Sequence, residues 1–279
     1  MTDDLERVTA IRDPRERALT VGKLIDEYQN LINELSRVRR DTLDELLATG
    51  ISQKQIADLL GMSKGRVSQL LTAGLKPERA FYGTGPVTVA IGAKREENRA
   101  DPSDILSVES FGAFELLSES ARKVGLSATH EVVPRPGNVH LNRPNLVVLT
   151  NPRLLPFLAQ VMEADPHIRY VEDGDGWFLF DNSTSTEYRS PRDRGDSADY
   201  GYVGRLPRPD GKGTFLYLAG THAPGTYGAA RYLVDNLATL YKELKARRFS
   251  FVVRYSYEEG NRLRMRSVER VTPIYRHEG

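Results

Sequence analysis

Apolar residues recur at alternating intervals of three and four positions between residues 15 and 49, a pattern that predicts one long amphipathic helix. Pro14 suits the first turn of this helix, and Gly22 is its weakest interior position. The spacing is typical of a short coiled coil, so it predicts a homodimer that pairs along this seam. The alternative is a helix, with or without a break near Asn30, that folds back on a small core of its own. The seam consists of Val21, Leu24, Tyr28, Leu31, Leu35 and Val38.

Two shorter amphipathic segments follow over residues 51–71. Ser52 and Ser63 can each cap the N-terminus of a helix, and Gly61 lies where the first helix would end. We therefore expect two short helices joined by a tight turn, the arrangement that places a helix in the major groove of DNA. The first helix is expected to direct three apolar side chains inward: Ile56, Leu59 and Leu60.

The second of these helices has an apolar stripe and a polar face. Val67, Leu70 and Leu71 have the spacing of the stripe, which leaves polar and cationic side chains pointing outward. Side chains of these types contact phosphates and base edges, so the expected partner is double-stranded DNA. The predicted DNA-binding residues are Lys54, Ser63, Lys64, Arg66, Ser68 and Gln69.

This segment resembles the helix-turn-helix of sigma-factor region 4 and of the many regulators that share it. The resemblance implies that Lys64, Arg66, Ser68 and Gln69 face DNA. No counterpart of sigma-factor region 2 is evident upstream, so we do not expect a true sigma factor. The alternative is an ordinary helical hairpin that packs on the rest of the protein. The matching residues are Ile56, Ala57, Leu60, Gly61, Ser63, Val67 and Gln69.

Positive charge gathers locally, although the chain of 279 residues has a formal net charge of only +1. Over residues 51–80, five Lys and Arg residues oppose two Asp and Glu residues, which gives a local charge of +3. A patch of this size contacts few phosphates, so one copy is expected to bind DNA weakly and with strong salt dependence. Useful affinity therefore calls for two copies.

The pattern changes near residue 80. Residues 72–84 are expected to form a linker between an all-α domain over residues 1–80 and a second domain over residues 81–279. In the second domain, apolar runs alternate with helical periodicity, an order typical of α/β folds. We expect a three-layer, Rossmann-like domain with an antiparallel insertion and edge. Strands are expected over residues 87–94, 127–133, 145–150 and 214–220, helices over 109–124, 156–164 and 227–240, and hairpins over 168–181 and 248–274.

Three strand ends in this domain carry glycine, polar or cationic residues. Ligands of α/β sheets gather at the carboxyl ends of parallel strands, where backbone N–H groups and helix N-termini converge. These residues predict a pocket for a small anionic or nucleotide-like ligand. The domain resembles Rossmann-like nucleotide and nucleoside folds in general, such as the nucleoside deoxyribosyltransferases. The predicted ligand-binding residues are Gly92, Lys94, Asn151, Arg153, Gly220, Thr221, His222, Gly225 and Thr226.

Each strand end also has a purely structural interpretation. Residues 220–226 can form a glycine-rich turn that is capped by its threonines and contains a structural histidine. Asn151 can cap the helix that follows it. Glu96 and Glu97 can pair with the cations Lys94 and Arg95. The sequence leaves both interpretations open.

Composition excludes several kinds of chemistry. The chain has no cysteine, which excludes disulfides and thiolate metal ligands, and its five histidines lack a metal-binding spacing. No nucleotide-binding GxGxxG or GK[ST] motif is present, so we expect neither a cofactor nor a metal. No apolar run is long enough to span a membrane, and residues 1–10 are unlike a signal peptide, which predicts a cytoplasmic protein.

Together these patterns predict a DNA-binding transcriptional regulator whose C-terminal domain senses a small ligand and is not an enzyme. Ligand binding is expected to shift the relative orientation of two helix-turn-helix units and so change DNA affinity. The alternative is a nucleoside hydrolase or glycosyl-transfer enzyme with a regulatory helix-turn-helix module, which needs a carboxylate such as Glu109, Asp181 or Glu187. A third interpretation makes the C-terminal domain a protein-docking module.

Overall fold

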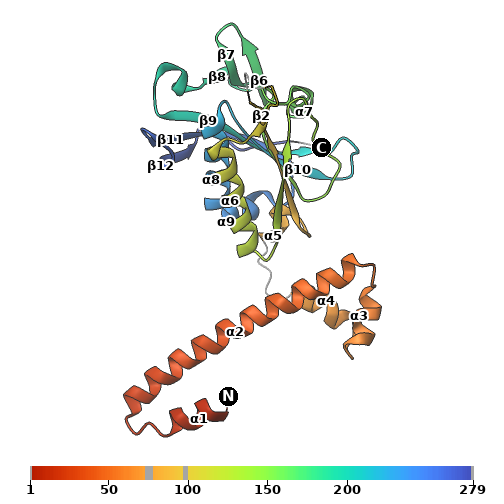
Figure 1. Ribbon diagram of the computed structural model, residues 1–279, viewed down its shortest axis with the longest axis vertical. Coiled ribbons are helices and arrows are strands. Elements are labelled where there is room, and N and C mark those ends of the chain that lie inside the picture. The colour runs from red at the N-terminus through yellow and green to blue at the C-terminus, as the bar shows by residue number, and fades with distance from the viewer. Residues whose placement is uncertain (1, 73–77, 97–99, 278–279) are drawn as a thin grey trace. The chain divides into compact units, whose positions relative to one another are not determined.

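The computed structural model describes residues 2–72, 78–96 and 100–277 of the chain (Figure 1). The chain divides into two compact units, Met1–Leu75 and Lys76–Gly279. The boundary expected near residue 80 falls inside a short helix, α5 (Arg79–Tyr82), which belongs to the second unit because Phe81 and Tyr82 are buried in its core. Residues 73–77 of the expected linker lie outside the described residues.

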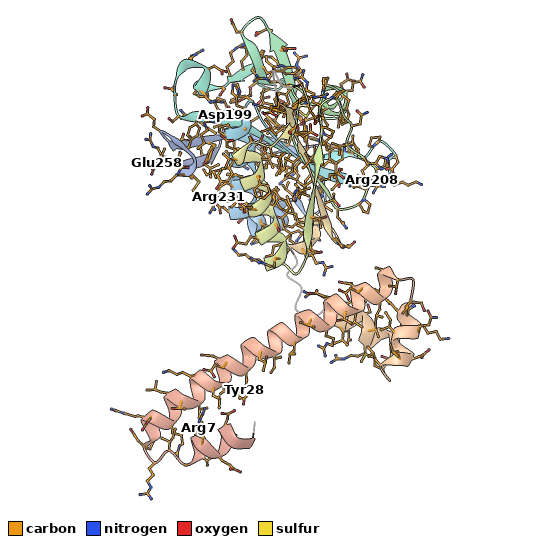
Figure 2. All side chains as sticks on the ribbon, in the orientation of Figure 1. Arg7, Tyr28, Asp199, Arg208, Arg231 and Glu258 are labelled. Carbon is orange, nitrogen blue, oxygen red and sulfur yellow. The ribbon has the colours of Figure 1, made fainter. Side chains whose placement is uncertain are left out.

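The first unit is helical in all its described elements. α2 (Pro14–Ala48) is a single helix of 35 residues with no break at Asn30, and the Asp13 side chain caps it. α1 (Thr2–Thr9), which no periodicity predicted, packs on α2, where the Tyr28 hydroxyl donates to the Asp4 carboxylate at 2.5 Å (Figure 2). The expected seam is thus occupied in part by α1. No helix within the described ranges is long and apolar enough to cross a membrane.

Two short helices follow α2: α3 (Gln53–Leu59) and α4 (Lys64–Thr72). Ser52 caps α3 in a capping box with Gln55, and Ser63 caps α4 by accepting the N–H of Arg66 at 3.1 Å. Gly61 ends α3 with a left-handed φ of 62°, a conformation that favours glycine. The core of this unit consists of Leu43, Ile56, Ala57, Val67 and Leu70.

The expectation that Leu59 and Leu60 point inward is wrong: their side chains are 68% and 43% exposed. α3 buries Ile56 and Ala57, so its buried face is centred between these two residues. At 100° per residue, Leu59 lies about 110° away from that centre. Leu60 is the C-cap, outside the helix. The buried stripe expected on α4 is present, because Val67 and Leu70 are buried.

A mixed sheet of eight strands forms the centre of the second unit. Its strands are β1 (Val87–Gly92), β4 (Ala128–Val133), β5 (Leu146–Leu149), β9 (Ala198–Pro207), β10 (Thr214–Gly220), β11 (Phe249–Glu258), β12 (Asn261–Arg270) and β13 (Tyr275–Arg276). They follow the order β12-β11-β9-β10-β5-β1-β4, and β13 pairs with β11. β4, β1, β5 and β10 are parallel, whereas β9 is antiparallel to both of its neighbours. The carboxyl ends of β1, β5 and β10 therefore share one edge of the sheet.

Both faces of this sheet are covered. Three helices lie on one face: α6 (Val108–Lys123), α8 (Ala223–Asp235) and α9 (Leu237–Leu244) (Figure 1). The other face packs against α7 (Leu158–Met162) and a separate sheet of β6 (Ile168–Asp173), β7 (Gly176–Asp181) and β8 (Thr186–Arg189). Along β5, Val147 packs into the core on the helical face of the sheet, and Val148 packs into the core on the opposite face. Burial on both faces explains why every residue of β5 is apolar. The unit is an α/β domain.

Two segments of the second unit differ from expectation. The helix expected over residues 227–240 begins earlier, at Ala223, because Pro224 suits its first turn, and it is interrupted at Asn236 before α9. The strand expected over residues 87–94 ends at Gly92, and Lys94 begins a separate strand, β2 (Lys94–Arg95), which a loop joins to β3 (Asp104–Ile105) in an antiparallel pair. Residues 97–99 of that loop lie outside the described residues.

Candidate functional site

A cavity opens where the carboxyl ends of β1, β5 and β10 meet the N-termini of α6 and α8. Its volume is about 130 Å³. Residues from all three predicted strand ends line it: Gly92, Lys94, Asn151, Arg153, Thr221, His222 and Thr226. Gly220 and Gly225 adjoin it in sequence but do not line it. Six further polar or charged lining residues were not predicted as ligand contacts: Ser107, Glu109, Ser110, Thr150, Arg192 and Arg262.

The turn after β10 is held by one buried carboxylate, that of Asp199 on β9, which is labelled in Figure 2. Its Oδ2 accepts the backbone N–H groups of His222 at 3.0 Å and of Gly225 at 2.7 Å. Its Oδ1 accepts the hydroxyls of Thr221 and of Ser190. The carboxylate thus occupies the N-terminus of α8, where a ligand anion would otherwise bind.

The glycines of this turn are required by close packing. A Cβ on Gly225 would lie 2.0 Å from the backbone oxygen of Tyr200, and a Cβ on Gly220 would lie 2.0 Å from that of His222. The Thr226 hydroxyl accepts the N–H of Gly220 at 2.8 Å. These contacts match the structural interpretation of residues 220–226. The glycines of this turn are therefore explained by packing, without a ligand.

Asn151 and His222 join neighbouring strand ends. Asn151 Nδ2 donates to the backbone oxygen of Gly220 at 2.8 Å, which ties β5 to β10. His222 Nε2 lies 2.8 Å from Asp193 Oδ1 on the short 3-10 helix η1 (Pro191–Arg194), and its Nδ1 lies 3.5 Å from the guanidinium of Arg153. Because a guanidinium only donates, Nδ1 accepts, which leaves Nε2–H to donate to Asp193. His222 thereby positions Arg153 beside the cavity.

Glu109, in the first turn of α6, is the only carboxylate that lines the cavity within the described part of the chain. Its side chain is 3% exposed, and its Oε1 lies 3.1 Å from Nη1 of Arg262 on β12, a side chain that is 49% exposed. The other two candidate carboxylates lie elsewhere. Asp181 is buried at the end of β7, and Glu187 pairs with Arg189 at the surface.

Thr150 places an unpartnered hydroxyl beside the cavity. The residue is 4% exposed, and its Oγ1 has no hydrogen-bond partner among the described residues. Gly92 at the end of β1 makes room for this side chain, since a Cβ there would lie 2.0 Å from Thr150 Oγ1. A buried hydroxyl without a partner costs about 1–3 kcal/mol. Thr150 therefore carries a buried polar group beside the cavity whose hydrogen-bonding capacity no described residue uses.

Cationic side chains outnumber the single carboxylate around the cavity: they are Lys94, Arg153, Arg192 and Arg262. Lys94 and Arg153 are exposed, whereas Glu109 and Thr150 are buried. We call the exposed side of the cavity, with Lys94 and Arg153, its mouth, and the buried side, with Glu109 and Thr150, its floor. A cavity whose charged lining residues are mostly cationic favours an anionic ligand.

The sequence, which named Glu109 only as a candidate catalytic carboxylate, could also have indicated it as a ligand contact. Ser107 caps α6 by accepting the N–H of Ser110 at 3.0 Å, and Glu109 lies in the first turn of that helix. Ligands of such sheets also contact the first turn of the helix that follows a strand end, and for β1 that helix is α6, which would have indicated Glu109 as a ligand contact. Arg262 had no such signal, because it reaches the cavity only through the pairing of β12 with β11.

The exposed face of α4 carries the predicted DNA-binding side chains. Lys64, Arg66, Ser68 and Gln69 are exposed, as is Lys54 on α3. The Arg66 guanidinium donates to Gln69 Oε1 at 3.3 Å, so these two side chains lie on the same side of the helix. Ser63 serves as the cap of α4.

Comparisons with known proteins gave no match among family models, curated proteins or solved structures. Among the described residues, no three His, Cys, Asp or Glu side chains are grouped so that they could hold a metal ion. What the two surfaces bind must therefore be inferred from their own chemistry.

Proposed function

We propose that this protein is a DNA-binding transcriptional regulator in which α3 and α4 form a helix-turn-helix and the α/β domain, interpreted as Rossmann-like, senses a small anionic ligand. The observation that carries the proposal is the exposed face of α4. This helix is capped by Ser63 and anchored by Val67 and Leu70, and it presents cationic and amide side chains outward. Such a face matches the recognition helix of a helix-turn-helix.

The side chains of this face divide by chemistry. Lys64 and Arg66 suit phosphate oxygens or guanine, and the Gln69 amide suits adenine. Lys54 on α3 suits the phosphate backbone, which the first helix of such a motif crosses. Phosphate contacts supply most of the affinity, whereas the contacts of α4 to base edges supply the sequence preference.

A second copy of the chain is the partner proposed for α2. Leu31, Leu35 and Val38 continue the heptad seam beyond Tyr28, and their side chains are 53%, 58% and 54% exposed. Monomeric proteins rarely leave such an apolar stripe uncovered. Pairing of two α2 helices buries it and supplies two DNA-binding units, as an operator with two half-sites requires.

The cavity of the α/β domain is the proposed sensory site. A ligand that binds one orientation of the DNA-binding units better than another shifts the population between them. A coupling of about 1–3 kcal/mol changes DNA affinity roughly 5- to 150-fold.

The proposal is tested by incubating the full chain with sheared genomic DNA from the source organism and sequencing the retained fragments. We expect enrichment of a small set of sites with two half-sites about 10 base pairs, or a multiple of this, apart. Arg66→Ala should lower enrichment about tenfold, whereas Lys23→Ala, which removes an exposed cation on α2, should not. Uniform retention of all fragments, or unchanged enrichment by Arg66→Ala, would contradict the proposal.

The burial of Glu109 in the cavity favours a second candidate function, hydrolysis or transfer at a glycosidic bond. A carboxylate in such a position can serve as nucleophile or base. The two functions are separated by incubating the chain with a panel of nucleosides and measuring free base by chromatography. Base release that Glu109→Gln abolishes supports the enzyme, whereas ligand binding without release supports the sensor.

A further inference from the structure

We propose that the cavity binds a phosphorylated pentose, with the phosphate at the cationic mouth beside Arg153 and Arg192 and the sugar hydroxyls directed to Glu109 and Thr150. This ligand class deepens the sensory role proposed above and rests on it. The chemistry is shared by a free sugar phosphate and by the ribose phosphate of a nucleotide.

The size of the cavity limits the ligand. Its volume of about 130 Å³ is well below the roughly 300–1,000 Å³ of sites that enclose drug-sized ligands. A dinucleotide or a whole nucleoside triphosphate therefore cannot be enclosed. A pentose with one phosphate is of the right scale, and the base of a nucleotide would have to lie outside.

The floor of the cavity carries groups that can form hydrogen bonds with the hydroxyl groups of a sugar. The Glu109 side chain is 3% exposed, and a carboxylate accepts hydrogen bonds at both oxygens, of which Oε1 already contacts Arg262. A buried carboxylate repels a bare phosphate but accepts sugar hydroxyls. Thr150 adds a buried hydroxyl that has no partner among the described residues and can both donate and accept.

The mouth of the cavity offers cationic side chains, rather than backbone N–H groups, to an anion. The N-terminus of α8 offers a ligand few backbone donors, because the N–H groups of His222 and Gly225 donate to Asp199 and Pro224 has none. Arg153, beside His222, and Arg192 on η1 line the cavity and present guanidinium groups, which bind phosphate bidentately. Floor and mouth together match a molecule with hydroxyls at one end and phosphate at the other.

The test is calorimetric titration of the full chain with ribose 5-phosphate, ribose, inorganic phosphate and AMP. We expect ribose 5-phosphate to bind at least tenfold more tightly than either ribose or inorganic phosphate. Tighter binding of ribose 5-phosphate than of AMP identifies a free sugar phosphate as the source, and tighter binding of AMP identifies a nucleotide. Both results support the shared chemistry.

Three variants assign the two ends of the ligand. Thr150→Val and Glu109→Gln should each lower the affinity for ribose 5-phosphate to that for inorganic phosphate. Thr150→Val is nearly isosteric, so it still tests the proposal if Glu109→Gln fails to fold. Arg153→Ala should weaken binding of ribose 5-phosphate and of inorganic phosphate about tenfold. Arg270→Ala, which removes an exposed cation of β12 outside the cavity, should change neither.

Equal affinity for ribose 5-phosphate and inorganic phosphate would overturn the proposal, as would the absence of binding to every probe. This failure is distinguishable from failure of the regulator proposal, because retention of DNA is measured on the same preparation without any sugar phosphate. If the chain retains specific DNA but does not bind ribose 5-phosphate, only the proposed ligand is wrong.

Discussion

The carboxylate of Asp199 on β9 accepts the backbone N–H of Gly225 at 2.7 Å, so an antiparallel strand caps the helix that follows β10. The approach is close on both sides: a Cβ on Gly201 would lie 2.2 Å from the backbone oxygen of Gly225. This contact fixes the turn beside the cavity. It also commits two backbone N–H groups of this glycine-rich turn, those of His222 and Gly225, to a carboxylate of the protein itself.

Asp199→Asn should destabilise the second unit by about 2–4 kcal/mol, because it removes a buried charge from four donors and turns an amide N–H₂ toward some of them. The measurement is the urea midpoint of the full chain. Asp196→Asn, which changes an exposed carboxylate close by in the chain, is the control. A loss no larger than that of the control would show that Asp199 does not hold the turn.

Arg262→Ala should destabilise the protein by about 1–2 kcal/mol, because it leaves the Glu109 carboxylate buried without its cation. The magnitude is kept low since Arg262 is 49% exposed and partly screened by water. Adding Glu109→Gln should remove most of this loss, which a double-mutant cycle from urea unfolding measures. Strictly additive losses would mean that the two side chains do not interact.

Stability should also fall at acid pH through Asp165. Burial alone raises the pKa of this carboxyl, but the hydrogen bond and charge of His277 and the backbone N–H of His167 outweigh burial and lower the net pKa. A lowered pKa in the folded state stabilises the protein above the pKa of the unfolded chain, about 3.9, and this contribution is lost as the pH falls from there through the lower folded value. Tyr202 also donates to this carboxylate, at 2.8 Å.

The acid effect is isolated by comparing urea midpoints between about pH 6 and pH 2.5 for the wild type and Asp165→Asn. The variant should be less stable at pH 6 and should lose less further stability below pH 4. Asp175→Asn, an exposed carboxylate in the turn between β6 and β7, should follow the wild type. Parallel curves for the wild type and Asp165→Asn would rule out this role.

Local patterns predicted the elements of this protein better than they predicted the contacts of the site. Features that depend on a few neighbouring residues could be predicted from the sequence. They are the caps Ser52 and Ser63, the break at Gly61 and the strand ends at Gly92 and Asn151. Contacts between residues far apart in the sequence could not be predicted in this way. Arg262 reaches the cavity from β12, and Asp199 reaches the turn beside the cavity from β9. The places of these two strands are set by sheet pairing rather than by local sequence.

The exposure of Leu59 and the packing of α1 on α2 had a similar cause. Both depend on which face a neighbouring helix covers, and hydrophobic spacing does not specify the neighbour. The seam of α2 was therefore predicted as one continuous stripe, although α1 contacts its Tyr28 end. The part that includes Leu31 and Leu35 is left exposed.

Leu35→Glu should convert a dimer of the full chain into a monomer, because it places a charge in the proposed seam of α2, where the leucine is 58% exposed in one copy. Light scattering after size exclusion should give twice 31.3 kDa for the wild type and 31.3 kDa for the variant. Gln29→Glu, off the seam on the same helix, should remain dimeric. A monomeric wild type would exclude pairing through α2.

The most direct test of the account is the salt dependence of DNA binding by the exposed face of α4. Each phosphate contact contributes about −0.9 to the slope of log affinity against log salt concentration. With Lys64 and Arg66 from two copies, fluorescence anisotropy of the full chain on duplex DNA should give a slope of about −4 or steeper. Lys64→Ala should bring the slope about 2 closer to zero, one contact in each copy, whereas Lys23→Ala should not. A slope near zero, or the same slope for the wild type and Lys64→Ala, would contradict the claim that α4 lies against DNA.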